Sequence, residues 1–191
     1  FSSAQTLLHS PIGMITIATV PIVIVGGLFY EFIEQNLRSP SIIAIASIFF
    51  GILLYFADLK QTKKDGVLEL TLLIGLLIGL SQILALIPGT SRSGITITIG
   101  LFLGLSRVEA LRFSFMLAIP VIAAATILQS IELFVIQLTD INYLHLFLGV
   151  FISFIIAFLT IRWFIEFVNR IGMLPFVIYR IFLGLIILLN L

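Results

Sequence analysis

The stretch ALIPGTSRSGITIT, residues 85–98, interrupts an otherwise apolar part of the chain. It places a proline, two glycines, an arginine and a group of hydroxyl side chains between two runs of aliphatic residues. Pro88 and Gly89 interrupt a helix and leave backbone groups without helical partners. Inside a membrane, such irregular backbone survives only where protein or a wet cavity surrounds it. The stretch therefore predicts a bend with polar groups at its tip.

The composition places this bend in a membrane protein. Of the 191 residues, 61% are hydrophobic and 10% are charged, and the mean hydropathy is +1.29. A soluble domain is about 45–50% apolar and about 25% charged. The excess runs along the whole chain, so neither a removable signal peptide nor a single anchor accounts for it. The absence of cysteine excludes disulfides and thiolate metal sites. We expect an all-α polytopic membrane protein with one transmembrane domain, residues 1–191.

Apolar stretches that can cross the bilayer recur along the chain. A helix needs roughly 20 residues to cross about 30 Å of hydrocarbon. About five spanning helices are predicted, at residues 12–30, 41–57, 113–137, 143–161 and 175–191.

Residues 67–105 fit a hairpin better than a pair of spans. The first arm, 67–87, is long enough to cross the bilayer. The second arm, 94–105, has 12 residues and reaches only about 18 Å. We therefore expect 67–105 to be a re-entrant helical hairpin that carries PGTSRSG at its tip.

The distribution of lysine and arginine supports this topology. If the residues before Ile12 are cytoplasmic, the outer loops hold only Arg38. The inner loops then hold Lys60, Lys63, Lys64, Arg107, Arg112, Arg162 and Arg170. Such an excess of basic residues is typical of cytoplasmic loops. A full crossing by 94–105 would move Arg107 and Arg112 outside and destroy the pattern. The hairpin tip is thus predicted to face the extracytoplasmic half of the bilayer.

The tip carries the groups of an oxyanion site. An arginine at membrane depth is costly and marks a functional site, and its planar guanidinium suits phosphate oxygens. Glycines let backbone N–H groups converge, and a helix that begins after the loop adds a positive dipole end. The predicted ligand is a phosphorylated lipid. The candidate residues are Gln82, Gly89, Thr90, Ser91, Arg92, Ser93, Gly94 and Thr96.

A structural role is the alternative for these polar residues. Arg92 can cap a broken helix or pair with Glu69 or Glu132, and serine and threonine commonly join transmembrane helices. Gln82 fits a helix–helix hydrogen bond as well as a ligand contact. Arg180, in the middle of the last predicted span, can be a structural ion-pair partner, and the sequence leaves its role open.

The segment GLSQILALIPGTSRSGITIT, residues 79–98, resembles the undecaprenyl-diphosphate phosphatases, the bacitracin-resistance family. The family pattern is a glycine and a glutamine followed by P-G-x-S-R-S-G-x-T. The resemblance continues through ATVPIVIVGGLFYEFIE (18–34), RFSFMLAIPVIAAAT (112–126) and YRIFLGLIIL (179–188). It implies hydrolysis of a polyprenyl diphosphate to the monophosphate and phosphate, which recycles the carrier lipid for cell-wall synthesis and gives bacitracin resistance. It also implies an inverted-repeat bundle in the bacterial inner membrane.

The resemblance assigns roles at the tip. Ser91, Arg92 and Thr96 match the family residues around the pyrophosphate, and Gln82 and Ser93 belong to the same motif. Arg92 would stabilise the charge of the phosphoryl group. Ser91 would donate a hydrogen bond or act near the nucleophile, although the sequence offers no base beside it. The implied partners are the polyprenyl diphosphate and the bilayer, with no nucleic acid; a divalent cation, Mg²⁺ or Ca²⁺, is implied as cofactor, and a homodimer stays open.

The chain lacks the second motif of the family, which contains paired acidic or Gln/Glu residues and a glycine followed by histidine. No Glu/Gln-x-x-x-Glu pair occurs, and FSSAQTLLH, residues 1–9, lacks the acidic residues and the glycine before histidine. We interpret the chain as N-terminally truncated. The metal ligands and the catalytic histidine would lie in the absent part, and no metal ligand is predicted in this chain.

Two other functions fit a bundle of this kind. Inverted repeats with broken helices also build transporters, which would carry a phosphorylated polyprenyl lipid or a small anion. A structural membrane subunit without a ligand is the third interpretation. A phosphatase with the motif S-R-x-x-x-x-x-H is excluded, because Thr98 stands where that histidine would be.

Overall fold

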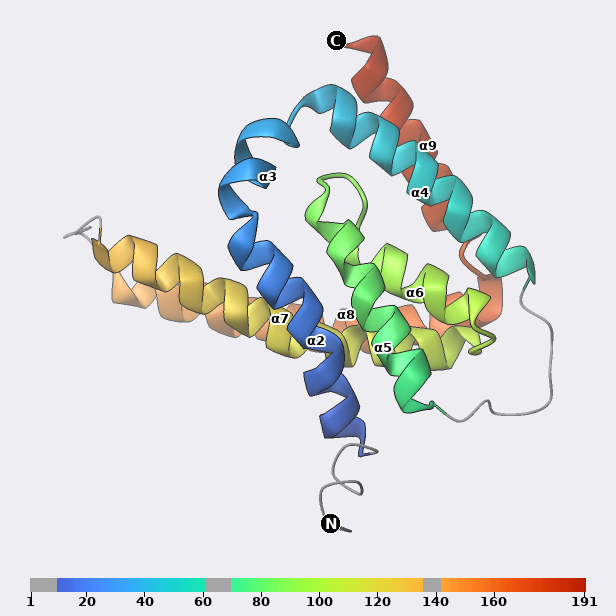
Figure 1. The fold of residues 1–191 in the computed structure, drawn as a ribbon, viewed down its shortest axis with the longest axis horizontal. Coiled ribbons are helices and arrows are strands. Elements are labelled where there is room, and N and C mark those ends of the chain that lie inside the picture. Colours follow the sequence, from blue (N-terminus) through green and yellow to red (C-terminus); the bar gives the residue numbers. More distant parts are fainter. Residues whose placement is uncertain (1–9, 61–69, 136–141) are drawn as a thin grey trace.

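The computed structural model describes residues 10–60, 70–135 and 142–191, and the elements in this part of the chain are helices (Figure 1). Three of them are long and apolar enough to cross a membrane, and a bent pair makes a fourth if it counts as one span. The predicted class, an all-α polytopic membrane protein, is confirmed. The elements are α2 (Pro11–Leu28), α3 (Tyr30–Asn36), α4 (Pro40–Lys60), α5 (Leu72–Ser81), the 3₁₀ helix η1 (Gln82–Leu86), α6 (Arg92–Phe102), α7 (Arg107–Val135), α8 (Tyr143–Ile171) and α9 (Leu174–Leu189).

Two of the predicted spans coincide with shorter elements. The helix α2 has 18 residues and is bent by 67° against α3. The helix α9 has 16 residues and is about 24 Å long, which is less than the thickness of the hydrocarbon core. The structure therefore offers three or four spans by length and composition, against about five in the sequence-based prediction. Which helices cross the bilayer stays a prediction.

Two helices extend beyond their predicted ends because charged residues belong to them. The helix α7 begins at Arg107, not at 113. Its first turn is closed by a capping box. Glu109 Oε2 accepts a hydrogen bond from the Ser106 N–H at 2.8 Å. In return, Ser106 Oγ accepts a hydrogen bond from the Glu109 N–H at 3.2 Å. The helix α8 continues past 161 to Ile171. An apolar window therefore finds the middle of such a helix but not its polar end.

A helical hairpin lies at the centre of the molecule. The helix α5 continues into η1, the chain turns at residues 87–91, and α6 returns beside α5 (Figure 1). The helix α6 has 11 residues, so it is only about 16 Å long. The structure thus contains the hairpin predicted at 67–105, with helices over residues 72–102. Residues 67–69 lie outside the described part, and its re-entry into a membrane stays a prediction.

Contacts between the helices place basic residues at one end of the molecule. Lys60 Nζ lies 6.0 Å from the ring centroid of Phe102, so the end of α6 is beside the end of α4. Arg107 forms an ion pair with Asp58 near the same end, with 2.6 Å between Nε and Oδ1. Arg38 precedes α4, at its other end. This grouping of basic residues agrees with the predicted topology. Lys63 and Lys64, which the prediction also places in an inner loop, lie outside the described residues.

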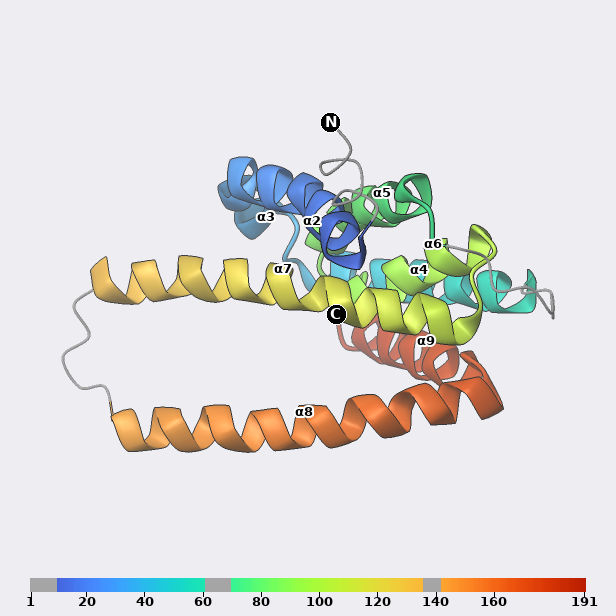
Figure 2. The ribbon, with the colours of Figure 1, turned by 90° about the horizontal axis from the view of Figure 1, so that it is seen from below.

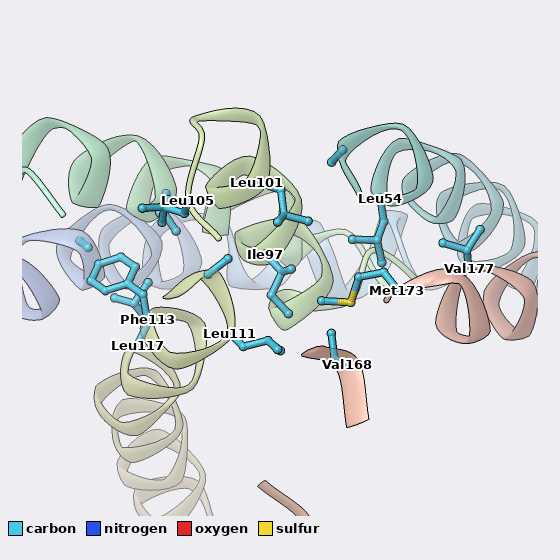
Figure 3. Close-up of a cluster of buried hydrophobic side chains, with 14 of the residues drawn as sticks. Leu54, Ile97, Leu101, Leu105, Leu111, Phe113, Leu117, Val168, Met173 and Val177 are labelled. Carbon is cyan, nitrogen blue, oxygen red and sulfur yellow. The ribbon is translucent and has the colours of Figure 1, made fainter. Parts of the chain in front are cut away.

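The buried core lies where α4, α6 and α7 meet the junction of α8 and α9. Figure 3 shows side chains from these elements pointing toward one another. The residues that it labels are Leu54, Ile97, Leu101, Leu105, Leu111, Phe113, Leu117, Val168, Met173 and Val177. Over an 18-residue window of α8 no residue is buried, and Figure 2 shows this helix at the edge of the molecule. The apolar surface of α8 is suited to lipid.

Candidate phosphate-binding site

The turn of the hairpin is held in an uncommon backbone conformation. Ser91 has φ 67° and ψ 111°, and it is the one residue other than glycine with positive φ in the described ranges. Its Oγ accepts a hydrogen bond from the Gly94 N–H at 3.2 Å and caps α6. Gly89 has φ 92°, and an added Cβ there would overlap the carbonyl of Ile43 on α4. Residues in such conformations cost free energy and are frequent at binding sites.

A cavity of about 430 Å³ opens beside this turn, within the usual range of about 300–1,000 Å³ for ligand pockets. Its lining separates into polar and apolar residues. The polar part consists of Ser47, Gly89, Ser91, Ser93, Gly94 and Arg180, with Tyr179 beside them. The apolar part consists of Leu54, Ile97, Phe164, Met173, Phe176 and Leu183. Of the predicted site residues, Gly89, Ser91, Ser93 and Gly94 are thus brought together on one cavity.

Arg92 and Thr96 lie on another face of α6. Arg92 Nη1 donates a hydrogen bond to the carbonyl oxygen of Ser114 on α7 at 3.0 Å. Thr96 Oγ1 and Ser114 Oγ are hydrogen-bonded at 2.8 Å. Residues four apart share one side of a helix, so both side chains hold α6 against α7. Neither lines the cavity, and their predicted contact with phosphate stays a prediction.

Thr90 and Gln82 are buried behind the turn. Both side chains are fully buried. Gln82 Nε2 donates to the Ala18 carbonyl oxygen of α2 at 3.1 Å, while Gln82 Oε1 and Thr90 Oγ1 have no hydrogen-bond partner. Gln82 therefore makes the helix–helix contact that the sequence left as an alternative to ligand binding. It does not line the cavity beside the turn.

Arg180 of α9 supplies the positive charge of the cavity. Its Nη2 donates to the Gly89 carbonyl oxygen at 2.7 Å, and its Nη1 is buried without a hydrogen-bond partner. The residue is 7% exposed. An added Cβ on Gly94 would lie 2.6 Å from Nη1, so the free amino group is directed at the first turn of α6. The sequence signal for Arg180 was a charged residue inside an apolar run, which marks a functional site by default.

The ion pairs suggested for Arg92 involve Glu69 and Glu132, whose side chains lie outside the described part of the chain, so these pairs stay predictions. The three salt bridges found among the described residues involve Arg38, Arg107 and Arg170, each with its own carboxylate. Neither Arg92 nor Arg180 takes part in them. The guanidinium of Arg180 therefore has no carboxylate partner among the described residues, and its positive charge is available to bind an anion.

The site is suited to an oxyanion. A buried N–H group without a partner costs about 1–3 kcal/mol, and an anionic oxygen beside Arg180 Nη1 would recover this. The N-terminus of α6 adds N–H groups and the positive end of a helix dipole. The hydroxyls of Ser91 and Ser93 line the same space and can donate further hydrogen bonds.

The same lining does not fit a divalent cation. Mg²⁺ and Ca²⁺ bind carboxylate, carbonyl and water oxygens, whereas a guanidinium in the cavity repels a cation. Residues 10–60, 70–135 and 142–191 contain no group of three histidine, aspartate or glutamate residues that could hold a metal ion. The predicted cation therefore has no ligand set here, and no chemical step is derived through it.

Comparison with known proteins places these features in a family. The family model of the bacitracin resistance protein BacA matches residues 3–186. The undecaprenyl-diphosphatase of Saccharophagus degradans is 48% identical over 170 residues, which cover 89% of this chain and 63% of that protein. The undecaprenyl-diphosphatase of Alteromonas mediterranea is 44% identical over 188 residues, 98% of this chain and 70% of that protein.

A third relative gives the same result. The undecaprenyl-diphosphatase of Campylobacter concisus is 48% identical over 174 residues, which cover 90% of this chain and 64% of that protein. The chain thus spans about two thirds of the length of the curated relatives that it matches. Together with the helical hairpin and its P-G-T-S-R-S-G turn, these matches show that the chain belongs to the family of the bacitracin resistance protein BacA.

Proposed function

We propose that this chain is part of an undecaprenyl-diphosphatase, which hydrolyses undecaprenyl or a related polyprenyl diphosphate to the monophosphate and phosphate. Such a reaction recycles the carrier lipid of cell-wall synthesis and confers bacitracin resistance. The observation that carries the proposal is Arg180, which lines a cavity with hydroxyl groups at the start of α6 and whose buried Nη1 has no hydrogen-bond partner. The names of the relatives support the same reaction.

The diphosphate binds at the polar part of the cavity in this proposal. Arg180 Nη1 contacts a phosphate oxygen, while Nη2 keeps its hydrogen bond to the Gly89 carbonyl. Charge-assisted hydrogen bonds of this kind are about twice as strong as neutral ones. Ser91 and Ser93 donate from the turn. Phosphoryl transfer depends mainly on positioning and on stabilising charge, and a fixed guanidinium provides both.

Arg92 and Thr96 contribute from behind the turn. Their hydrogen bonds to Ser114 fix the rotation of α6 and therefore the direction in which Ser93 and Gly94 face. The resemblance assigns Ser91, Arg92 and Thr96 to the catalytic site, and a direct contact of Arg92 with the phosphates remains part of the proposal. A base that activates the nucleophile is not assigned, since no histidine or carboxylate from the described ranges lines the cavity.

In this proposal the protein lies in the bacterial inner membrane with the turn facing the extracytoplasmic side. The turn packs on Ile43, near the end of α4 that follows Arg38, and away from the end with Lys60 and Arg107. Basic residues favour the cytoplasmic side. A divalent cation, with ligands other than the residues that line this cavity, and a second subunit are further expectations of this proposal.

Replacing Arg180 tests the proposal. Arg180→Ala should weaken the binding of farnesyl diphosphate by the detergent-solubilised chain by at least tenfold. Where phosphate release is measurable, kcat/KM should fall by roughly 10²–10³. Arg162→Ala removes an exposed arginine of α8 and should change neither quantity. Undiminished binding by Arg180→Ala would refute the proposed site. Transfer of the lipid across vesicles without phosphate release would indicate a carrier instead.

A further inference from the structure

Ser47 carries a buried hydroxyl group in the middle of α4. The residue is 6% exposed, and it lines the cavity beside the hairpin turn. Its Oγ makes no hydrogen bond with the described residues and is not fully enclosed by them. A ligand in the cavity can therefore reach this oxygen.

Other hydroxyl side chains inside the helices bond back to the preceding turn. Thr98 Oγ1 donates to the Gly94 carbonyl oxygen at 2.7 Å. Ser130 Oγ donates to the Thr126 carbonyl oxygen, also at 2.7 Å. Such a bond satisfies the hydroxyl locally, whereas a buried hydroxyl without a partner costs free energy. Ser47 is therefore unfavourable in an apolar helix unless a partner in the cavity bonds to it.

The neighbours of Ser47 on α4 show what its side chain faces. Ile43, Ser47 and Gly51 are spaced by four residues and share one side of the helix. An added Cβ on Gly89 would overlap the Ile43 carbonyl, so this side of α4 contacts the hairpin turn. An added Cβ on Gly51 would lie 3.3 Å from the Cβ of Arg180. Along α4, Ser47 thus lies between the contact with the turn and the contact with Arg180.

Arg180 connects these two contacts. Its Cβ lies beside Gly51, and its Nη2 donates to the Gly89 carbonyl oxygen at 2.7 Å. The side chain therefore extends toward the turn along the part of α4 that carries Ser47. Nη1 of the same guanidinium is buried without a hydrogen-bond partner, and both residues line one cavity. An anion bound to Nη1 is then close to a hydroxyl donor from α4.

We propose that Ser47 is a substrate-binding residue whose Oγ donates a hydrogen bond to a phosphate oxygen held by Arg180. This inference rests on the proposed function, because it assumes that the diphosphate occupies the cavity. Binding requires no hydrogen bond of Ser47 to be broken first. The anion is then contacted from the hairpin turn, from α9 and from α4, so that one ligand joins three separate parts of the chain.

The variant Ser47→Ala tests this contact, because alanine keeps the small size and removes the hydroxyl. Titration calorimetry with farnesyl diphosphate and the detergent-solubilised chain should show binding weakened about tenfold, the loss expected for a hydrogen bond to a charged group. The melting temperature should not fall, because alanine has the higher helix propensity and the hydroxyl has no partner to lose. Ser130→Ala on α7 is the matched control and should bind normally.

Two results would overturn the contact. One is undiminished binding by Ser47→Ala. The other is weaker binding together with a lower melting temperature, which would assign Ser47 to the packing of α4. Inorganic diphosphate adds a further check, because a contact with the phosphates should cost it the same factor as farnesyl diphosphate. A loss confined to farnesyl diphosphate would contradict the proposed contact.

Arg180→Ala separates a failure of this inference from a failure of the proposed function. If Arg180→Ala weakens binding and Ser47→Ala does not, the phosphate site stands and the donor from α4 is refuted. If the unmodified chain binds neither diphosphate, or if Arg180→Ala binds as tightly as the unmodified chain, the phosphate site and the contact with Ser47 are both refuted.

Discussion

Arg92 belongs to the hairpin tip and Arg180 contacts the tip from α9, and the two arginines have different hydrogen-bond partners. Arg92 donates to a backbone carbonyl of α7, so it joins two helices. Arg180 donates to the tip from α9 and retains a buried amino group without a partner. An unpaired buried charge is unfavourable, and the closeness of Gly94 lets a ligand approach it. The position of a glycine therefore decides whether this charge can be used.

Replacing that glycine should close the site. Gly94→Ala places a methyl group 2.6 Å from Arg180 Nη1, which forces the guanidinium to move away from the start of α6. Diphosphate binding, followed by titration calorimetry, should fall at least tenfold. Gly27→Ala is the matched control, because an added Cβ there meets no atom within 4 Å. The control should bind normally and gain about 0.5–1 kcal/mol of stability.

Ser91 combines a helix cap with a strained backbone, and two substitutions separate these contributions. Ser91→Ala removes the cap and keeps the strain at φ 67°, so thermal unfolding should show a loss of about 1–2 kcal/mol. Ser91→Gly also removes the hydroxyl but accepts positive φ, and its stability should change by only a few tenths of a kcal/mol. In the proposed site, both variants lose a hydroxyl that donates to the phosphate. If Ser91→Gly binds the diphosphate as tightly as the original chain, the hydroxyl is not a ligand contact.

At the scale of elements, Asp58 joins three helices at the end opposite the tip. Its carboxylate accepts from Arg107 Nε at 2.6 Å and Nη2 at 3.0 Å, and from the Met173 N–H at 3.1 Å. Met173 also lines the cavity. The contact thus fixes the ends of α4, α7 and α9 around the cavity, and Gly172 with φ 86° leaves room for it.

Removal of this carboxylate should destabilise the helical assembly. Asp58→Ala leaves Arg107 and the Met173 N–H without their acceptor, at a cost of about 1.5–3 kcal/mol for hydrogen bonds to a charged group. The comparison is Glu166→Ala, which breaks the exposed pair with Arg170 on α8 and should cost less than about 0.5 kcal/mol. Denaturant titration in detergent measures both. Equal effects of the two substitutions would show that the Asp58 contact is not structural.

The elements were predictable where the signal is local. The hairpin followed from the length of its second arm and from Pro88 and Gly89 at its tip, and α6 has the short length expected. The faces of α6 were not predictable, because they depend on how Ser91 starts the helix. That start turns Ser93 and Gly94 toward the cavity and Arg92 toward α7. The hydrogen bond between Arg180 and Gly89 joins residues 91 positions apart, and no local pattern reports such a contact.

At the scale of the whole molecule, the apolar surface requires a bilayer, and the ends of the helices indicate its orientation. Lys60 and Arg107 lie at the open end of the hairpin, and Arg38 lies at the other end of α4. Basic side chains are retained on the cytoplasmic side. In the proposed orientation the hairpin tip lies toward the extracytoplasmic half of the bilayer.

Labelling of single cysteines tests this orientation, because the chain contains no cysteine of its own. In intact cells, a membrane-impermeant maleimide should label Ser39→Cys, which lies beside Arg38, and Ser91→Cys at the exposed turn. Lys60→Cys should react only after the cells are opened, because the basic end faces the cytoplasm in the proposed orientation. Leu101→Cys, buried at 3% exposure, should stay unlabelled in both preparations. Labelling of Lys60→Cys but not of Ser39→Cys in intact cells would invert the topology, and the phosphate site would then open toward the cytoplasm.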